Sequence, residues 1–304
     1  MQHFHNAKLL TRRSLLGGFA ALAAGVRARA AWADVHSAIA ATDWAAAETM
    51  LALSIVPLAI PDTAVYRQWM GATPLPASIH DLGSRAEPNF EMLAALRPDC
   101  ILISNWQANL AAQLGVIAPV HKVTIIDPPQ APLANARRAL LEIGGLVSKE
   151  DVARQWLAEF DKVQRAAITL LRDCANRDVI VGVLHENGRQ IYAYGSGSWV
   201  HEVILLLGLN NALRAPTSRF GNALIDIAQL AETPKARLLY LDQGSRTRQA
   251  EMALARSTVW NRIPMVQAQQ VYRIPVFYPL GGLPSVRRFV DILVSVMTQP
   301  GNRP

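Results

Sequence analysis

The chain has 304 residues, 51% of them hydrophobic and 17% charged, which is enough for one large domain or two smaller ones. Its formal net charge of +7 is concentrated at the N-terminus, because five of the 30 Lys and Arg residues and no acidic residue lie in the first 33 positions. The remainder carries 25 basic and 23 acidic residues with no basic stripe, which excludes nucleic acid as a predicted partner.

The first 33 residues have the order of an export signal. A basic start containing Arg12-Arg13 is followed by an apolar run over 15–26, which is too short to cross a bilayer as a helix. Small residues then offer cleavage sites near Ala30 or Ala33. We predict a signal peptide over 1–33, of the twin-arginine kind because of the paired arginines, and a mature protein that is soluble outside the cytoplasm. The alternative is an uncleaved, buried N-terminal helix.

Short apolar runs alternate with helical stretches through the first half, which is the pattern of an α/β protein. The predicted strands are Leu58–Ile60, Cys100–Ile103 and Val123–Ile126. The predicted helices are Trp44–Ala52, Asn89–Leu96 and Leu110–Val116.

A long helix is predicted between the two halves. Residues 149–174 contain neither Pro nor Gly, and their apolar residues recur at helical spacing. Ser148 is the predicted N-cap, and Gly144-Gly145 is expected to interrupt the helical stretch before it. About 26 helical residues would span on the order of 40 Å. We predict an N-terminal lobe over 34–147, a linking helix over 148–176 and a C-terminal lobe over 177–304. The alternative is a helix packed on one continuous sheet.

The second half repeats the alternation. The predicted strands are Val179–Leu184, Leu238–Leu241 and Val271–Ile274, and the predicted helices are Val200–Leu207, Asp226–Ala231 and Ser285–Val296. The run Gly195–Ser198 is interpreted as a tight turn that caps a helix beginning near Trp199. The fold class is therefore α/β, with two Rossmann-like lobes joined by one long rigid helix and a ligand cleft between the lobes.

Signatures of catalysis and of metal binding are missing from the sequence. No G-x-S-x-G elbow, P-loop or H-E-x-x-H motif occurs, so no enzyme, cofactor or protein-bound metal is predicted. Cys100 and Cys174 are the only cysteines and have no metal-ligand spacing. They form either a disulfide or, as we favour, two buried thiols.

Aromatic residues and one arginine follow the predicted strands, where open α/β domains bind ligands. These residues are Trp44, Trp69, Arg85, Trp106, Phe220 and Tyr278. Together they predict an aromatic cleft with a cationic hydrogen-bond donor, which suits a ligand with an apolar shell and delocalised oxygen charge.

The run Asp81–Asn89, continued by Leu96–Asp99, resembles the periplasmic binding proteins of iron and cobalamin uptake. Tyr66–Trp69 narrows the resemblance to the iron(III)-hydroxamate subfamily, as do Trp260–Pro264 and Tyr272–Pro275. This resemblance implies a monomeric periplasmic protein that binds a ferric siderophore in a cleft between two lobes and delivers it to an ABC permease of the inner membrane.

The resemblance also assigns roles to residues. Arg85 matches an arginine that donates hydrogen bonds to hydroxamate oxygens, and Trp44 and Trp69 match cleft-wall tryptophans. Phe220 and Tyr278 stand where the family often has tryptophan. The family's tyrosine after the strand ending at Ile103 is absent here, and Trp106 or Gln107 is the predicted substitute. The predicted permease contacts are Glu91 and Glu202.

Two alternatives remain open at this point. Within the same fold, the ligand could be haem, cobalamin or a catecholate siderophore; haem predicts a Tyr or His iron ligand and a catecholate predicts several cationic side chains. A secreted α/β enzyme is the alternative from another class, and it requires a group of catalytic residues that the sequence does not offer.

Overall fold

The computed structural model describes residues 38–70, 74–126 and 131–298. These residues belong to one compact unit. The predicted signal peptide over 1–33 lies outside the described residues. Within the described ranges, no helix is both long enough and apolar enough to cross a membrane.

The first half forms a five-stranded parallel sheet in the order β3-β2-β1-β4-β5. Its strands are β1 (Ile39–Ala41), β2 (Ala59–Ile60), β3 (His80–Asp81), β4 (Cys100–Ser104) and β5 (Val120–Val123). Its helical segments are α2 (Trp44–Ala52), α3 (Thr63–Trp69), α4 (Phe90–Leu96), η1 (Asn105–Leu110) and α5 (Ala111–Leu114). The direction of winding reverses between β1 and β4, which is where doubly wound sheets open a crevice beyond their carboxyl ends.

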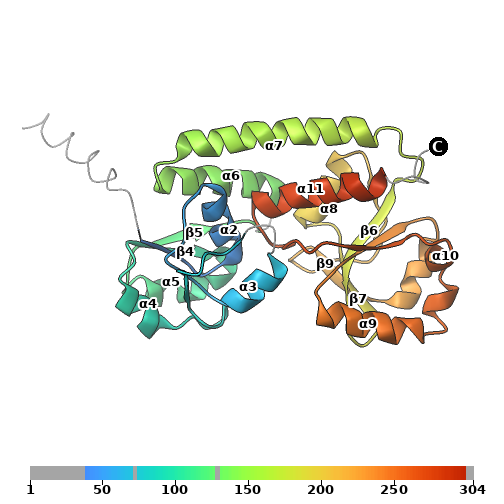
Figure 1. The fold of residues 1–304 in the computed structure, drawn as a ribbon, viewed down its shortest axis with the longest axis horizontal. Helices are drawn as coiled ribbons and strands as arrows, with labels where there is room; N and C mark the ends of the chain where they lie inside the picture. Colours follow the sequence, from blue (N-terminus) through green and yellow to red (C-terminus); the bar gives the residue numbers. More distant parts are fainter. Residues whose placement is uncertain (1–37, 71–73, 127–130, 299–304) are drawn as a thin grey trace, which may run out of the picture. The chain divides into compact units, whose positions relative to one another are not determined.

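The long helix is present, although it is shorter than predicted. Helix α7 (Glu150–Leu171) has 22 residues, about 33 Å at 1.5 Å per residue. It packs against α6 (Pro132–Leu146) and α11 (Leu283–Met297), and Figure 1 shows it running alongside both. The predicted interruption at Gly144-Gly145 is wrong, because α6 continues through both glycines. A Cβ on Gly144 would lie 2.8 Å from Ala153 Cβ, so glycine allows the two helices to approach closely.

The predicted N-cap of α7 is also wrong. Ser148 has a positive φ of 53°, and Lys149 occupies the cap position without a side-chain cap hydrogen bond. The chain turns directly from α6 into α7 here, since Lys149 N donates to Gly144 O. The left-handed turn needed for that hydrogen bond removes Ser148 from the extended conformation that an N-cap requires.

The second half forms a mixed sheet in the order β11-β10-β6-β7-β9, with β8 paired to β6. Its strands are β6 (Asp178–Leu184), β7 (Gln190–Tyr194), β8 (Asn210–Asn211), β9 (Asn222–Asp226), β10 (Arg237–Leu241) and β11 (Val271–Ile274). Besides α11, its helical segments are α8 (Trp199–Leu206), η2 (Ile227–Glu232), α9 (Ser245–Ala255), η3 (Trp260–Arg262) and α10 (Pro264–Gln267). The Gly195–Ser198 turn caps α8 as predicted, because Ser198 Oγ accepts a hydrogen bond from His201 N.

A large apolar core extends through both halves, and each half also contains a separate, smaller cluster. The large core contains buried residues of both sheets together with residues of α2, α6, α7, α8 and α11. The predicted α/β fold with two lobes and a long linking helix is confirmed. The lobe boundaries themselves stay predictions, because the described residues cluster as a single unit.

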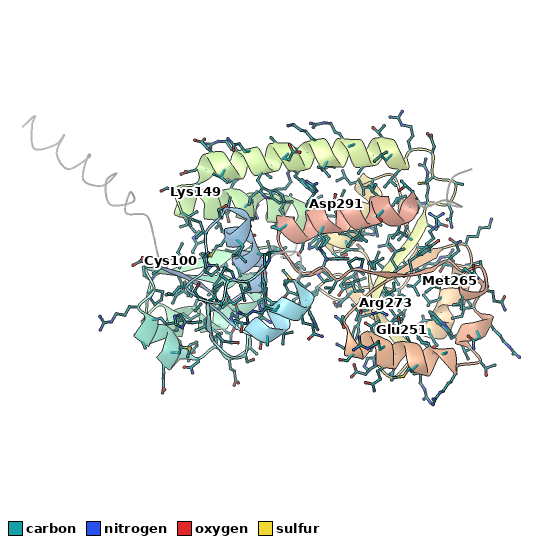
Figure 2. All side chains as sticks on the ribbon, in the orientation of Figure 1. Cys100, Lys149, Glu251, Met265, Arg273 and Asp291 are labelled. Atoms are coloured by element: carbon teal, nitrogen blue, oxygen red, sulfur yellow. The ribbon has the colours of Figure 1, made fainter. Side chains whose placement is uncertain are left out.

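The two cysteines are free and buried. Cys100, labelled in Figure 2, begins strand β4, which lies between β1 and β5, and its side chain lies within the core. The interpretation of two buried thiols is therefore confirmed.

Candidate functional site

A cavity of about 470 Å³ lies between the two sheets, at the carboxyl ends of the parallel strands of the first one. Asp62, Arg85 and Trp106 follow β2, β3 and β4 and line its first side. The complete lining is Asp62, Trp69, Ser84, Arg85, Ala86, Trp106, Tyr194, Phe220, Asn222, Gln243, Phe277, Tyr278, Pro279 and Leu280. Five of the seven predicted ligand-binding residues therefore meet at one place: Trp69, Arg85, Trp106, Phe220 and Tyr278.

Arg85 is held from three directions. Its Nε donates to Asp62 Oδ2 at 3.2 Å, and its Nη1 donates to Tyr278 Oη at 3.1 Å. Its guanidinium carbon lies 3.6 Å from the centre of the Trp44 ring, which is a cation–π contact. A guanidinium carries five N–H donors in a fixed plane, so these contacts orient it and leave further donors for a ligand at the cavity.

Trp44 and Gln107, the other two predicted residues, do not line the cavity. Both are completely buried. Trp44 Nε1 donates to Pro61 O at 2.9 Å, and the ring faces the guanidinium of Arg85. Gln107 Nε2 donates to Arg85 O at 2.9 Å and to Thr42 O at 3.0 Å. The two residues support the backbone and side chain of Arg85 from behind, so in this structure they have no surface to offer a ligand.

Trp106 does reach the cavity, and it is 40% exposed. Its Nε1 donates to Asp43 Oδ2 at 3.1 Å, so the ring is held at the place where it lines the cavity. Burial raises the pKa of Asp43 above its usual value, against opposing hydrogen bonds from Ala45 N and Trp106 and against the nearby charge of Arg85. Of the two predicted substitutes for the family's tyrosine, only Trp106 is placed to touch a ligand.

The second sheet contributes the opposite wall. Tyr278 follows β11 and packs on Trp44 with ring centres 5.4 Å apart. Burial raises the pKa of the Tyr278 phenol, so it remains a neutral hydrogen-bonding group at physiological pH. Phe220 lies before β9 and is half-buried beside the cavity. The two rings give this wall an aromatic surface.

Gly221 positions Phe220 in a way that another residue cannot. Its φ is +69°, and a Cβ at this position would lie 2.2 Å from Ser198 N and 2.4 Å from Gly197 C. Gly221→Ala should therefore lower the free energy of unfolding by about 2 kcal/mol or more, measured by denaturant titration. Gly83→Ala is the control, because Gly83 has φ +75° but nothing within 4 Å of its Cβ position. Equal losses for both variants would show that the clash at Gly221 is relieved by a small backbone shift.

Several cavity residues are absent from the prediction. Asp62 and Gln243 follow strands, as Arg85 does, and this position was the available signal for both. Tyr194 ends the antiparallel strand β7, which is not among the strands predicted from the sequence. The Gln243 side-chain oxygen is buried and lacks a hydrogen-bond partner among the described residues.

The two predicted permease contacts differ in their surroundings. Glu91 is exposed in the first turn of α4. Glu202 is half-buried in the first turn of α8, and its Oε2 accepts a hydrogen bond of 2.7 Å from Leu133 N at the start of α6. Burial raises the pKa of Glu202. Glu202 therefore caps a neighbouring helix, whereas the carboxylate of Glu91 faces solvent.

The arrangement defines a class of protein. A largely aromatic cavity with one fixed guanidinium lies between two α/β lobes that a long helix connects, which is a design for holding a ligand. Among the residues that the structure describes, no group of three or more His, Cys, Asp or Glu side chains is placed to hold a metal ion. The fold and the cavity are those of a two-lobed binding protein.

Comparison with known proteins identifies the family. The model of the periplasmic binding protein family matches residues 39–276, so the chain belongs to that family. It is 30% identical over 256 residues to the iron(3+)-hydroxamate-binding protein FhuD of Escherichia coli, covering 84% of this chain and 85% of that protein. The Fe(3+)-citrate-binding protein YfmC of Bacillus subtilis is 28% identical over 135 residues, which is 44% of this chain and 41% of that protein.

Solved structures show the same fold. The FhuD of Vibrio cholerae, crystallised with Fe3+–Desferal bound, superposes with a TM-score of 0.77 at 28% identity, covering 86% of this chain and 97% of that chain. The petrobactin-binding protein YclQ of Bacillus subtilis gives a TM-score of 0.71 at 18% identity, covering 86% of this chain and 92% of that chain. The second likeness bears on the fold alone.

Proposed function

We propose that this protein binds a ferric hydroxamate siderophore in the cavity, outside the cytoplasm, and delivers it to the permease of an ABC importer. The observation that carries the proposal is the guanidinium of Arg85, fixed by Asp62, Tyr278 and Trp44 at the edge of an aromatic cavity. The iron(3+)-hydroxamate-binding protein FhuD of Escherichia coli is similar to this chain over most of its length, and so is the siderophore-binding protein FhuD of Vibrio cholerae with Fe3+–Desferal bound.

The chemistry of such a complex matches the cavity. Three bidentate hydroxamates supply six oxygens to Fe(III), so the metal needs no ligand from the protein. Arg85 can donate to hydroxamate oxygens at the surface of the complex, a charge-assisted contact worth about 1.5–3 kcal/mol. The aromatic walls, formed by Trp69, Trp106 and Phe220, can cover the carbon chains that link the hydroxamates. Burying roughly 200 Å² of ligand apolar area would contribute about 5 kcal/mol before the entropy losses of binding.

A titration of the purified mature protein tests this function. Tryptophan fluorescence is followed while ferric hydroxamate, ferric catecholate, haem and cobalamin are added separately. We expect saturable quenching by the ferric hydroxamate, with no turnover of the ligand. The proposal fails if the hydroxamate complex does not bind, or if spectroscopy finds the bound iron coordinated by a tyrosine such as Tyr194 or Tyr278.

Delivery requires export and docking, and both remain part of the proposal. The signal peptide over 1–33, cleaved near Ala30 or Ala33, would direct the protein to the periplasm. The mature protein is proposed to be a monomer there. Glu91 and Glu202 are the candidate contacts with cationic residues of the permease. Because Glu91 is exposed, it is the better position to test, whereas a change at Glu202 would also remove its hydrogen bond with Leu133.

Glu91→Lys should lower siderophore-dependent iron uptake in cells by about tenfold, because a like charge placed against a cationic surface is repelled. The dissociation constant for the ferric siderophore, measured on the purified variant, should stay unchanged. Glu159→Lys makes the same charge change on the exposed side of α7 and serves as the control. Uptake at the wild-type level in the Glu91 variant would remove Glu91 from the docking surface.

A further inference from the structure

The side chain of Asp62 does not serve the helix whose N-cap position this residue occupies. Asp62 has a left-handed backbone with φ 52° and occupies the N-cap position of α3, yet its side chain makes no cap hydrogen bond within the described structure. Asp81 supplies that bond instead, because its Oδ2 accepts from Thr63 N at 3.1 Å and from Thr63 Oγ1 at 2.5 Å. The carboxylate of Asp62 is therefore available for another purpose.

That carboxylate is turned toward Arg85. Asp62 Oδ2 accepts from both the backbone N and the Nε of Arg85, each at 3.2 Å. The side chain of Asp62 is 30% exposed, and the residue lines the cavity beside Arg85. With Nε bound to Asp62 and Nη1 bound to Tyr278, the plane of the guanidinium is set by partners on both lobes.

The charges at the cavity are balanced. Among the described residues that line it, Arg85 is the one cation and Asp62 the one carboxylate. A smaller adjoining cavity shares Trp106, Phe220 and Tyr278 and adds a second carboxylate, Asp43, whose pKa burial raises. The cavity thus presents oriented N–H donors without a net positive charge.

We propose that Asp62 is a specificity-determining residue. It orients the guanidinium of Arg85 and cancels the positive charge of that guanidinium. The cavity therefore accepts ferric complexes in which the chelating groups neutralise Fe(III), and it rejects anionic complexes. The proposal rests on the proposed function and names its ligand class more narrowly. Three hydroxamates, each with one negative charge, neutralise Fe(III), whereas three catecholates leave a complex of charge 3−. Coulomb repulsion scales with the product of the charges, so a carboxylate at the cavity acts far more strongly on the trianion.

Two substitutions separate the charge of Asp62 from its orienting role. Asp62→Asn keeps one side-chain oxygen for Arg85 and tolerates the left-handed backbone, and it removes the negative charge by placing an NH2 group where the second oxygen was. Asp62→Gly also suits a positive φ but removes the oxygen as well. Dissociation constants are measured by fluorescence for two probes: Fe3+–Desferal acetylated on its terminal amine, which is uncharged, and ferri-bacillibactin, a triscatecholate. Unfolding curves confirm that each variant is folded.

We expect Asp62→Asn to tighten binding of ferri-bacillibactin by about tenfold at low salt and to shift the ratio of the two dissociation constants toward the triscatecholate. The gain should shrink as salt screens the charges. Asp62→Gly should show the same shift in preference and also weaken hydroxamate binding about tenfold, because Arg85 loses its anchor. Glu87→Gln, which makes the same charge change at an exposed position in the same loop, should leave both affinities unchanged.

The possible failures are distinguishable. If the wild-type protein does not bind the ferric trihydroxamate, the proposed function is wrong and this inference falls with it. If the wild type binds it but the ratio of the two dissociation constants is the same in wild type, Asp62→Asn and Asp62→Gly, the function stands and the role of Asp62 in selection is wrong. A shift of equal size in Glu87→Gln would show that overall charge, and not Asp62, sets the preference.

Discussion

Arg85→Ala should raise the dissociation constant for a ferric trihydroxamate by about ten- to a hundredfold. The guanidinium is oriented by Asp62, Tyr278 and Trp44, so little conformational freedom is lost when it binds a ligand oxygen. A charge-assisted hydrogen bond is worth about 1.5–3 kcal/mol, and each 1.4 kcal/mol changes the constant about tenfold. The substitution also leaves the carboxylate of Asp62 without its cation at the cavity wall.

Titration of tryptophan fluorescence measures this effect. Arg67→Ala is the matched control, because Arg67 is an exposed arginine on α3 that does not line the cavity. Arg85→Lys should fall between wild type and Arg85→Ala, since an ammonium keeps the charge but lacks the planar set of donors. Equal affinities for wild type and Arg85→Ala would remove Arg85 from the binding site.

Glu48 gives the largest expected effect on stability. It lies on α2 and is 2% exposed, and its Oε1 and Oε2 accept hydrogen bonds from Gly282 N and Ser285 Oγ at the start of α11. Glu48→Ala should lower the free energy of unfolding by about 3 kcal/mol, because it leaves both donors buried without a partner. The contact joins helices from the two ends of the sequence, so its loss should affect the global unfolding transition. Denaturant titration measures the change.

The same residue predicts how stability depends on pH. Burial raises the pKa of Glu48 from 4.5 to about 8, against the opposing hydrogen bonds from Ser285 and Gly282. Between these values the folded state keeps a proton that the unfolded state has lost. The free energy of unfolding should therefore fall as pH rises from about 4.5 to about 8, by at most about 1.4 kcal/mol per pH unit from this group.

Glu48→Gln isolates that contribution, because an amide does not ionise in this range. The difference in free energy of unfolding between Glu48→Gln and wild type should grow in favour of the variant from pH 5 to pH 8. Glu159→Gln, at an exposed position on α7, should give a curve parallel to wild type. If the Glu48→Gln and wild-type curves are also parallel, Glu48 titrates normally and the inferred effect of burial is wrong.

The elements that the sequence predicts well are those with a local signal. Helix α2 begins and ends at the predicted residues, and so does strand β11. Strand β5 is a contrasting case: the β-branched run predicted 123–126, whereas the strand is Val120–Val123. Its limits are set by pairing with β4, where Ile101 lies opposite Val120, and such pairing is not encoded in the run itself.

In the candidate site, too, some features follow from local sequence signals and others depend on tertiary contacts. That aromatic rings and an arginine gather at the carboxyl ends of the strands follows from their positions in the sequence, and five of the seven predicted residues line one cavity. The sequence positions do not determine which of these side chains face the cavity and which are buried behind its wall. Trp44 is buried beneath Arg85, where its ring nitrogen donates a hydrogen bond to Pro61 O. Trp106 is partly exposed at the cavity, where its ring nitrogen donates a hydrogen bond to Asp43 Oδ2.

By itself, the sequence determined the α/β class, the long helix and the kind of side chain that a ligand would meet, because periodicity and the order of elements are local properties of a chain. Only the tertiary structure decided that Asp62 faces Arg85, that Gln107 supports the same loop from behind, and that Glu48 joins α2 to α11. These contacts link residues 22 to 234 positions apart. Their existence depends on how the sheets pack, which no short segment specifies.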